Sequence, residues 1–403
     1  SGLPRDVRLG DHVTLRNAGH SVEADIVGLQ RGSVRAAPHG TSDGISVGDM
    51  AILAPHAIFA PDDSWIGRVI DPYGIPLDGR PILPGLVPRP VRTAAPPAYG
   101  RRGLGSRIET GLAVMNTLLP LVRGQRIGLF AGSGVGKSTL LAQLAGGVDA
   151  DVIVIGLVGE RGRELREFVE QTLGAEGMAR SVIVTATSDR APQVRRRCAL
   201  AATAVAEHFR DQGAHVLFLC DSITRFAEAH REVAAAGGEG ATLRGWPPSL
   251  AHAIMSLAER AGPGAEGAGD ITAIFSVLVA GSDMEEPVAD ILRGVLDGHV
   301  ILDRRIAERG RFPAVDLLRS VSRSLPDCAS EDENALLVEG RRLLSAYDRA
   351  ELMVQSGLYV AGSDPLTDRA IRLYSALDGF LAEGVAHGGP EAAFTRLRAI
   401  LQT

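Results

Sequence analysis

The sequence predicts an α/β protein in which a mostly parallel central sheet is preceded by a small β unit and followed by helices. Short strand-like segments broken by Gly, Pro, Asp and Asn fill the first 92 residues. From about residue 103 to residue 326, continuous apolar runs alternate with amphipathic helical stretches, which is typical of parallel strands buried on both faces. Beyond residue 328 only helical spacing remains. We therefore expect three domains, at residues 1–92, 93–328 and 329–403.

The N-terminal unit is expected to be a small β-barrel or sandwich. Its β-branched residues alternate partly with polar ones in four segments, residues 11–16, 22–30, 49–54 and 65–71. Several short strands with frequent turns are typical of such folds. Prolines then accumulate between residues 83 and 99, at Pro84, Pro88, Pro90, Pro96 and Pro97. This density excludes a regular element, so we interpret the stretch as a linker.

The central and C-terminal domains are predicted from two different periodicities. Five apolar runs of strand length are expected to form the central sheet, at residues 126–130, 152–159, 181–185, 216–220 and 271–279. Three later segments combine helical spacing with good helix formers, at residues 334–355, 365–383 and 390–401. The chain is therefore expected to end in a small helical domain.

Composition and charge exclude several classes of protein. With 45% hydrophobic and 22% charged residues, the chain has the balance of a folded globular protein rather than a disordered one. Its 42 Lys and Arg against 48 Asp and Glu give a net charge of −6, so it lacks the positive field of a general nucleic-acid binder. Three scattered cysteines, Cys198, Cys220 and Cys328, indicate a reducing compartment and neither a disulfide framework nor a structural zinc site. No apolar run is long enough to span a bilayer, so we expect a cytoplasmic protein.

The strongest local signal is a glycine-rich turn between an apolar strand and a helical pattern, in residues 127–140, IGLFAGSGVGKSTL. Such a turn lets consecutive backbone N–H groups converge on phosphate oxygens at a helix N-terminus. Lys137 can neutralise phosphate charge, and the Ser138 hydroxyl can reach a magnesium ion. Ala131 replaces the first glycine of the usual pattern, where a small residue suffices. The predicted nucleotide contacts are Gly132, Ser133, Gly134, Val135, Gly136, Lys137, Ser138 and Thr139.

Two acidic residues follow strands whose carboxyl ends should meet this loop. Asp221 closes an apolar run, so it is a candidate to hold magnesium directly or through water, while the alternative role is a helix N-cap. Glu160 follows the run at residues 152–158. Because hydrolysis needs a polar group that orients water towards the γ-phosphate, Glu160 is a candidate for that role. The alternative is a solvated charged turn at the head of the next helix.

An arginine often stabilises the charge that develops during phosphoryl transfer. The candidates in this sequence are Arg190, the run Arg195, Arg196 and Arg197, Arg225 and Arg323. Because the three consecutive arginines fall inside a helical pattern, at least one of them is expected to be solvated or to lie at an interface.

Six motifs in order resemble the F/V-type ATPase catalytic family, and most closely its protein-export branch, the flagellar type III export ATPases. They are residues 131–140, 156–164, 187–192, 221–226, 244–250 and 312–316. Residues 67–79, 285–290, 296–300 and 357–366 also resemble that branch. The resemblance covers nearly the whole chain. It implies an N-terminal β-barrel, a RecA-like P-loop NTPase core and a C-terminal helical domain, assembled as a hexameric ring with nucleotides between subunits.

The same resemblance implies roles for individual residues. Glu160 would orient the attacking water, and Arg161 would contact the γ-phosphate side of the site. Phe312 would pack against adenine, and Arg323 would be the arginine finger that reaches a neighbouring subunit's nucleotide. ATP and Mg²⁺ are the expected ligands, with Ser138 on the metal. The expected catalytic set is Lys137, Glu160, Arg161, Asp221 and Arg323.

The expected function is ATP hydrolysis that energises or regulates protein export through the flagellar type III secretion apparatus. An injectisome secretion ATPase is the nearest alternative, because both branches share these motifs, and a rotary ATP synthase subunit is disfavoured by the shorter chain. An RNA translocase would need aromatic stacking residues, and the N-terminal unit offers only Phe59, Trp65 and Tyr73. A non-catalytic ring subunit would have lost catalytic residues that are all present here.

By the same resemblance, the partners are further copies of this chain in a hexamer, together with export regulator, gate and chaperone–cargo proteins, and no specific nucleic acid. Assembly would take place at the cytoplasmic face of the inner membrane. Because the chain begins Ser-Gly rather than Met, we expect a preceding partner-binding helix to be missing. We therefore predict a monomer or weak oligomer in dilute solution, and a stable hexamer seen by light scattering would contradict this. The pore loop is expected within residues 284–298.

Overall fold

The computed structural model describes residues 3, 6–17, 19–54, 59–242, 244–279, 284–384 and 388–403. The strands are β1 (His12–Arg16), β2 (Ser21–Gln30), β3 (Ser33–Pro38), β4 (Met50–Leu53), β5 (Arg68–Ile70), β6 (Arg126–Ala131), β7 (Val152–Val158), β8 (Ser181–Ala186), β9 (His215–Asp221), β10 (Gly262–Pro263), β11 (Asp270–Leu278), β12 (Gly298–Leu302) and β13 (Val321–Ser322). The helices are α1 (Ala113–Asn116), α2 (Lys137–Gly147), α3 (Gly162–Glu167), α4 (Gly174–Met178), α5 (Pro192–Asp211), α6 (Ile223–Gly237), α7 (Leu250–Ala258), α8 (Pro287–Val295), α9 (Arg304–Glu308), α10 (Glu331–Gln355), α11 (Pro365–Ala382) and α12 (Gly389–Gln402). Short helical turns complete the set at η1 (Asp63–Trp65), η2 (Ala98–Gly100) and η3 (Phe168–Leu173).

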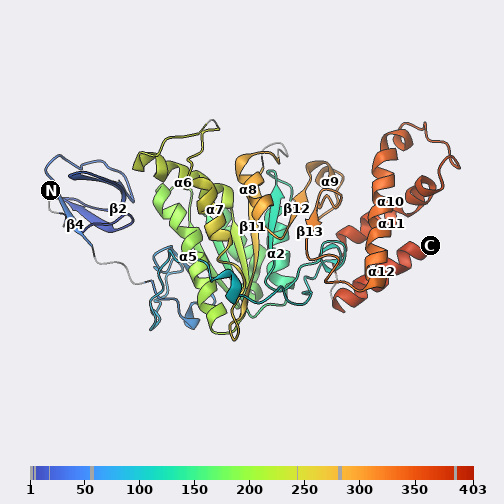
Figure 1. Cartoon of the computed structure of the whole chain (residues 1–403), viewed down its shortest axis with the longest axis horizontal. Helices are drawn as coiled ribbons and strands as arrows, with labels where there is room; N and C mark the ends of the chain where they lie inside the picture. The colour runs from blue at the N-terminus through green and yellow to red at the C-terminus, as the bar shows by residue number, and fades with distance from the viewer. Residues whose placement is uncertain are drawn as a thin grey trace.

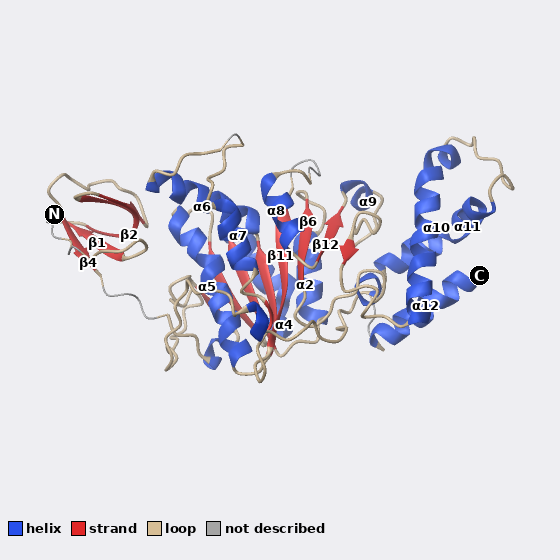
Figure 2. Cartoon of the chain, viewed as in Figure 1, coloured by secondary structure: helices blue, strands red, loops and turns tan. Residues whose placement is uncertain are grey.

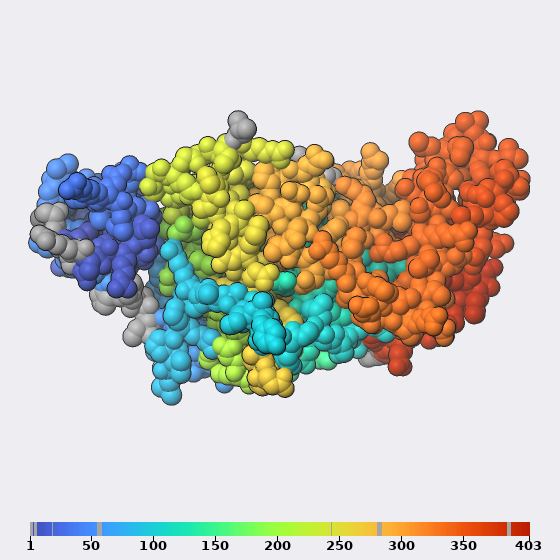
Figure 3. All heavy atoms as spheres, in the orientation of Figure 1, coloured from blue at the N-terminus to red at the C-terminus, as the bar shows by residue number. Residues whose placement is uncertain are grey.

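The molecule is elongated, with the small sheet β1–β4 at one end, the large sheet in the middle and α10–α12 at the other end (Figure 1). The space-filling view shows the same three parts in sequence order along the long axis (Figure 3). No helix among the described residues is long and apolar enough to cross a bilayer.

The large sheet has the strand order β13-β12-β6-β11-β9-β7-β8-β5. Neighbouring strands from β12 to β5 are parallel, whereas β13 is antiparallel to β12 and the short β10 is antiparallel to β11. The strand that precedes the predicted phosphate loop, β6, therefore lies inside the sheet, with β11, β9 and β7 in succession beside it. Their carboxyl ends share one edge, which is where open α/β sheets bind ligands.

Both faces of this sheet are buried, as the continuous apolar runs predict. On β7, Ile153 and Ile155 belong to a core shared with α2, η3 and α10–α12. The alternating residues Val154 and Val158 belong to a second core shared with α5–α8. Successive side chains of a strand point to opposite faces, so one apolar strand serves both layers. Figure 2 shows helices on both sides of the strands.

The N-terminal unit forms a four-stranded antiparallel sheet in the order β3-β2-β1-β4. Its buried apolar core is small and consists of Val13, Ala24 and Ile26. The helix α6 contacts β2, and the side-chain amide of Gln193 at the start of α5 donates to the Ala37 carbonyl over 2.9 Å. The small sheet is thus held against the helices of the central part.

One segment predicted for the N-terminal unit belongs to the large sheet instead. The strand-like residues 65–71 contain β5, which pairs in parallel with β8. The reason is apolar burial, because Phe59, Trp65 and Ile70 pack into the core on the α5 side of the large sheet. The Trp65 indole N–H also donates to the Leu83 carbonyl over 2.8 Å. The assignment of this strand to a separate β unit was wrong.

The remaining predicted elements are confirmed. Within the predicted linker, residues 83–99, no α-helix or strand forms, in agreement with its prolines, and only the short turn η2 begins at its end. The C-terminal helices α10, α11 and α12 follow the three predicted segments within a few residues. Ser330 and Glu333 form a reciprocal capping box at the start of α10, which satisfies backbone donors that the first turn leaves free.

Candidate nucleotide-binding site

The glycine-rich turn lies between β6 and α2, as predicted. Gly134 and Gly136 have φ angles of +76° and +86°, a conformation that L side chains rarely adopt. Gly136 is also the N-cap of α2, so the loop ends where the free N–H groups of an eleven-residue helix begin. Such N–H groups and the helix dipole favour a bound anion. The loop therefore has the backbone geometry of a phosphate cradle.

Lys137, the first residue of α2, forms an ion pair with Asp221 at the end of β9. Both side chains are largely buried, with exposed fractions of 11% and 6%. The Ser276 hydroxyl on the adjacent strand β11 donates to the same carboxylate over 2.5 Å. A buried carboxylate is tolerated only when paired and hydrogen-bonded, and here both conditions are met. The ammonium and the carboxylate that the sequence predicts for phosphate and metal are thus brought together.

Glu160 follows β7 through Gly159, whose φ angle of +70° turns the chain at the carboxyl edge of the sheet. Its side chain is half-buried. Burial, followed by the negative charge of Asp221, raises the pKa of Glu160 to about 7. A carboxylate poised near neutrality can accept a proton or a hydrogen bond from water, as a water-orienting group requires.

Lys137 and Glu160 line an open cleft of about 850 Å³, within the range of ligand pockets. Its wall includes most of the predicted loop, namely Gly132, Ser133, Gly134, Gly136, Lys137, Ser138 and Thr139. Val135 does not line the cleft with its side chain, which is only 2% exposed and packs in the core. Only its backbone N–H can therefore contribute to the loop. A second hollow of about 260 Å³ is lined by Ser138, Glu160 and Asp221 together.

The donor set of this second hollow fits a magnesium ion. It combines the hydroxyl of Ser138 with the carboxylates of Asp221 and Glu160, and oxygen donors of this kind are what Mg²⁺ prefers. The two positive-φ glycines beside it supply the backbone cradle for phosphates. An Mg²⁺–nucleotide complex is therefore compatible with the residues present.

Arg225 adds a further positive group to the large cleft. Its Nη1 pairs with Glu228 over 3.0 Å. Its Nε is buried, and no described residue accepts a hydrogen bond from it. A buried guanidinium N–H without a partner is costly, so this atom is a donor available to an anionic ligand. Of the arginines that the sequence singled out, Arg195 also lines the cleft.

Arg161 lies at the cleft wall, but its guanidinium forms an ion pair with Glu164 on α3. The pair spans 2.8 Å, and the Arg161 side chain is 78% exposed. Arg161 is the N-cap residue of α3. Its predicted contact with the γ-phosphate remains a prediction.

Phe312 lies beside the phosphate loop. A Cβ atom built on Gly136 would come within 3.2 Å of the Phe312 ring, a tight contact that a larger residue would relieve only by displacing the ring. The ring is 51% exposed. An exposed aromatic face next to a phosphate cradle is suited to stack on a base.

Arg323 lies elsewhere, at the opposite end of the sheet. Its backbone N–H donates to the Asp297 carbonyl over 2.9 Å. The Asp297 carboxylate accepts in turn from the backbone of Arg126, the first residue of β6. Arg323 is therefore roughly 17 Å along the strand from the phosphate loop. Its exposed guanidinium donates to the Arg293 carbonyl over 3.1 Å and does not line the cleft of its own subunit.

Sequence reasoning missed Ser276. The available signal is a hydroxyl inside the apolar run of β11, because a polar group buried in such a strand needs a hydrogen-bond partner. The sequence also gives no reason to distinguish Arg225 from the other candidate arginines. Both roles depend on which strands and helices are adjacent in space, and the order of the sheet decides that.

Two family models match the chain. The nucleotide-binding domain of the ATP synthase alpha/beta family matches residues 111–322. The C-terminal domain of the type III secretion ATPase EscN matches residues 329–398. The matched regions are the large-sheet part with the cleft and the helical part.

Curated relatives match over nearly the full length. The flagellum-specific ATP synthase of Caulobacter vibrioides is 45% identical over 390 residues, which are 95% of this chain and 88% of that protein. The type 3 secretion system ATPase of Xanthomonas euvesicatoria is 42% identical over 380 residues, 94% of this chain and 86% of that protein.

Solved structures agree in fold. The assembled ATPase EscN from the enteropathogenic E. coli type III secretion system superposes with a TM-score of 0.91 at 34% identity, over 98% of this chain and 96% of that chain. The structure of EscN with its central stalk EscO gives a TM-score of 0.88 with the same identity and coverage.

Proposed function

Because the chain belongs to the ATP synthase alpha/beta family, in the branch of the flagellar and type III secretion ATPases, we propose that it hydrolyses Mg²⁺-ATP to energise or regulate protein export through the flagellar type III apparatus. The observation that carries the proposal is that Glu160 lines both hollows beside the phosphate cradle, together with Lys137 in the larger one and Asp221 in the smaller one, while Lys137 and Asp221 form an ion pair. This is the minimum set for binding a triphosphate and directing water at it.

Each residue has a defined task in this proposal. The backbone N–H groups from Gly132 to Thr139 hold the phosphates, and the Lys137 ammonium exchanges its partner Asp221 for the β- and γ-phosphate oxygens. Bound Mg²⁺, held by Ser138 and Asp221, would supply charge neutralisation of the phosphates. Glu160 in its ionised form accepts a hydrogen bond from the attacking water and orients it in line. Phe312 stacks on the adenine.

We further propose that catalysis is completed in a ring of six subunits. Arg323 lies too far from its own phosphate loop to act there, so its exposed guanidinium is placed to reach the nucleotide of a neighbouring copy. Arg161 contacts the γ-phosphate side of its own site. The assembled EscN structure supports this type of oligomer. We also propose that the N-terminal unit, in which four strands form one sheet, has the β-barrel fold expected of this family.

The partners and location follow the same branch. An export stalk protein analogous to EscO, together with export gate and chaperone–cargo proteins, would bind the ring at the cytoplasmic face of the inner membrane. An injectisome ATPase is the second candidate, because the Xanthomonas secretion ATPase is nearly as similar as the flagellar relative.

Two experiments test these proposals. Glu160→Gln should lower kcat for phosphate release by about 10²–10⁴-fold while the affinity for a fluorescent ATP analogue stays within a factor of a few. Glu176→Gln, which changes an exposed acidic residue on α4 that lines neither hollow, should behave as the wild type. Equal turnover of Glu160→Gln and wild type would contradict the assigned role. In the source bacterium, a strain carrying only the Glu160→Gln chain should fail to secrete flagellar filament protein, and unaltered filament secretion with lost virulence-factor secretion would favour the injectisome.

A further inference from the structure

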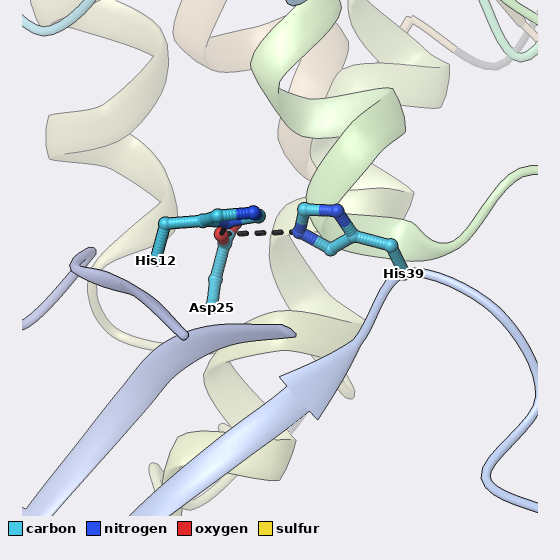
Figure 4. A group of neighbouring side chains, drawn as sticks. All are labelled: His12, Asp25 and His39. Atoms are coloured by element: carbon cyan, nitrogen blue, oxygen red, sulfur yellow. Dashed lines mark hydrogen bonds and ion pairs between the residues drawn. The ribbon is translucent and has the colours of Figure 1, made fainter. Parts of the chain in front are cut away.

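A second group of ionisable side chains lies far from the cleft, on the N-terminal sheet. His12 on β1 is the direct cross-strand partner of Asp25 on β2. Asp25 is paired in turn with Ala37 on β3, and His39 follows two residues later, on the same face by strand alternation. Figure 4 shows the three side chains meeting at one point. Three adjacent strands therefore bring together residues that are 13 and 14 positions apart.

The geometry of this His12–Asp25–His39 cluster matches a metal site. The carboxylate Oδ1 of Asp25 is 3.1 Å from Nδ1 of His12 and 3.1 Å from Nε2 of His39. One potential ligand atom from each residue lies within 4.8 Å of the other two. Ligands of tetrahedral Zn²⁺ at about 2.0–2.1 Å are roughly 3.3 Å apart. Only small side-chain movements separate the cluster from that arrangement.

The surroundings of the cluster also resemble those of a metal ligand set. Nε2 of His12 is 2.9 Å from Oε2 of Glu23, so this nitrogen can carry the proton and donate it to the carboxylate. Nδ1 is then left with its lone pair directed at Asp25. Metal-binding histidines are commonly oriented by a carboxylate on the far nitrogen in this way. The Tyr73 hydroxyl, from the central part, lies 3.1 Å from the same Nε2 of His39 that faces Asp25, so a metal bound to this nitrogen would replace that hydrogen bond.

The N-terminal sheet would gain stability from a metal bound at this cluster. Among the described residues its buried apolar core consists of Val13, Ala24 and Ile26, and a core of this size contributes little stability by itself. Small units of this kind are often stabilised by a structural metal. A metal on β1, β2 and the end of β3 would tie three strands together next to Tyr73, whose ring also contacts the Arg197 guanidinium at 4.6 Å.

We propose that His12, Asp25 and His39 bind one Zn²⁺ ion, with solvent as the fourth ligand, and that this ion stabilises the N-terminal sheet against the central part. Two imidazoles and one carboxylate form a donor set that suits Zn²⁺ rather than Mg²⁺. The side chains are 14–21% exposed, so solvent can enter while the ligands stay positioned. The cysteine count of the sequence pointed away from zinc, and this site uses no cysteine. The inference is independent of ATP hydrolysis.

The test measures zinc binding by the whole chain after a chelator has removed bound metal. Titration calorimetry and metal analysis give the affinity and the stoichiometry, in buffer with excess Mg²⁺ and no nucleotide. The wild type should bind one equivalent of Zn²⁺ and show a higher Tm with it. His39→Gln should lower the affinity more than 100-fold, and Glu23→Gln, which changes only the orienting carboxylate, should lower it about 10–100-fold. His20→Gln is the matched control, because His20 is an exposed histidine of the same unit. It should bind as the wild type.

Two results would overturn the proposal. One is the absence of stoichiometric binding to wild type, which would mean that the cluster is a hydrogen-bonded group only. The other is equal binding by wild type, His39→Gln and Glu23→Gln, which would place the ion elsewhere. Because Glu23 is about half exposed, its variant should fold even if His39→Gln does not, and circular dichroism checks this.

Discussion

The two ends of the central sheet are built differently. At the carboxyl end, Lys137, Asp221 and Ser276 are buried and satisfy one another, with Glu160 half-buried beside them. At the amino end, Arg323 is exposed, and the described residues offer its guanidinium a backbone carbonyl but no carboxylate within ion-pair distance. The proposed shared site would require this difference, because each subunit would then hold most of one active site and one arginine of another.

The largest expected effect comes from the amino end. Arg323→Ala should lower turnover by about 10³–10⁵-fold with nucleotide affinity nearly unchanged, because the lost charge acts on the transition state. Steady-state phosphate release and equilibrium nucleotide binding measure the two quantities. Arg342→Ala removes another exposed arginine, on α10, and should leave both unchanged. If Arg323→Ala hydrolyses ATP normally, the two ends of the sheet are not parts of one site.

The carboxyl end should impose a pH dependence. Since the pKa of Glu160 is raised to about 7 and only its ionised form can act as a base and a strong, charged acceptor towards water, kcat should fall as pH drops below 7. The expected slope is about tenfold per pH unit well below the midpoint. Profiles of kcat and of nucleotide Kd between pH 5.5 and about 8.5 separate catalysis from binding. A flat kcat profile over this range would argue against a raised Glu160 pKa in the working enzyme.

Phe312 should affect binding rather than chemistry. Loss of stacking in Phe312→Ala should raise KM for ATP by about 5–150-fold, equivalent to about 1–3 kcal/mol per stacked base, and leave kcat within a factor of a few. Phe312→Tyr keeps an aromatic face and should restore a wild-type KM. If both variants have a normal KM, the ring merely packs against Gly136.

The smallest expected effect is on stability. The folded pKa of Glu160, about 7, exceeds its ordinary value of 4.5, so the folded state binds a proton more tightly than the unfolded state. The free energy of unfolding therefore falls as pH rises from 4.5 to 7, where the buried carboxylate ionises. Glu160→Gln should raise it by about 1–2 kcal/mol at pH 8 without nucleotide, allowing for solvent screening, and leave it unchanged near pH 4. Urea unfolding at the two pH values tests this, and an equal gain at both would assign the effect to packing.

The sequence predicts those parts of the molecule whose signal is local. The phosphate loop is predicted from one continuous stretch, and the positive φ angle at Gly136 favours glycine there. The carboxylates of Asp221 and Glu160 are predicted because parallel strands share a carboxyl edge. The C-terminal helices follow from periodicity and capping.

The parts that escape prediction depend on pairing between distant segments. The strand β5 reads like its N-terminal neighbours and joins β8 only because Trp65 and Ile70 find a larger apolar core there. Ser276 acquires a role because β11 lies beside β9. The His12–Asp25–His39 cluster has no local motif, since the register of three strands alone brings the three residues together.

The central claim is that Glu160 of one subunit and Arg323 of another complete one site. The direct test is ATPase activity per subunit over a wide range of protein concentration with saturating Mg²⁺-ATP, for Glu160→Gln and Arg323→Ala alone and mixed in equal amounts. Each variant alone should be inactive at every concentration, whereas wild-type activity per subunit should rise with concentration. In mixed rings about one interface in four joins an intact Glu160 to an intact Arg323, so up to about a quarter of wild-type activity should return. No recovery on mixing, together with concentration-independent wild-type activity and an active Arg323→Ala, would contradict the shared site and leave a self-contained monomeric ATPase.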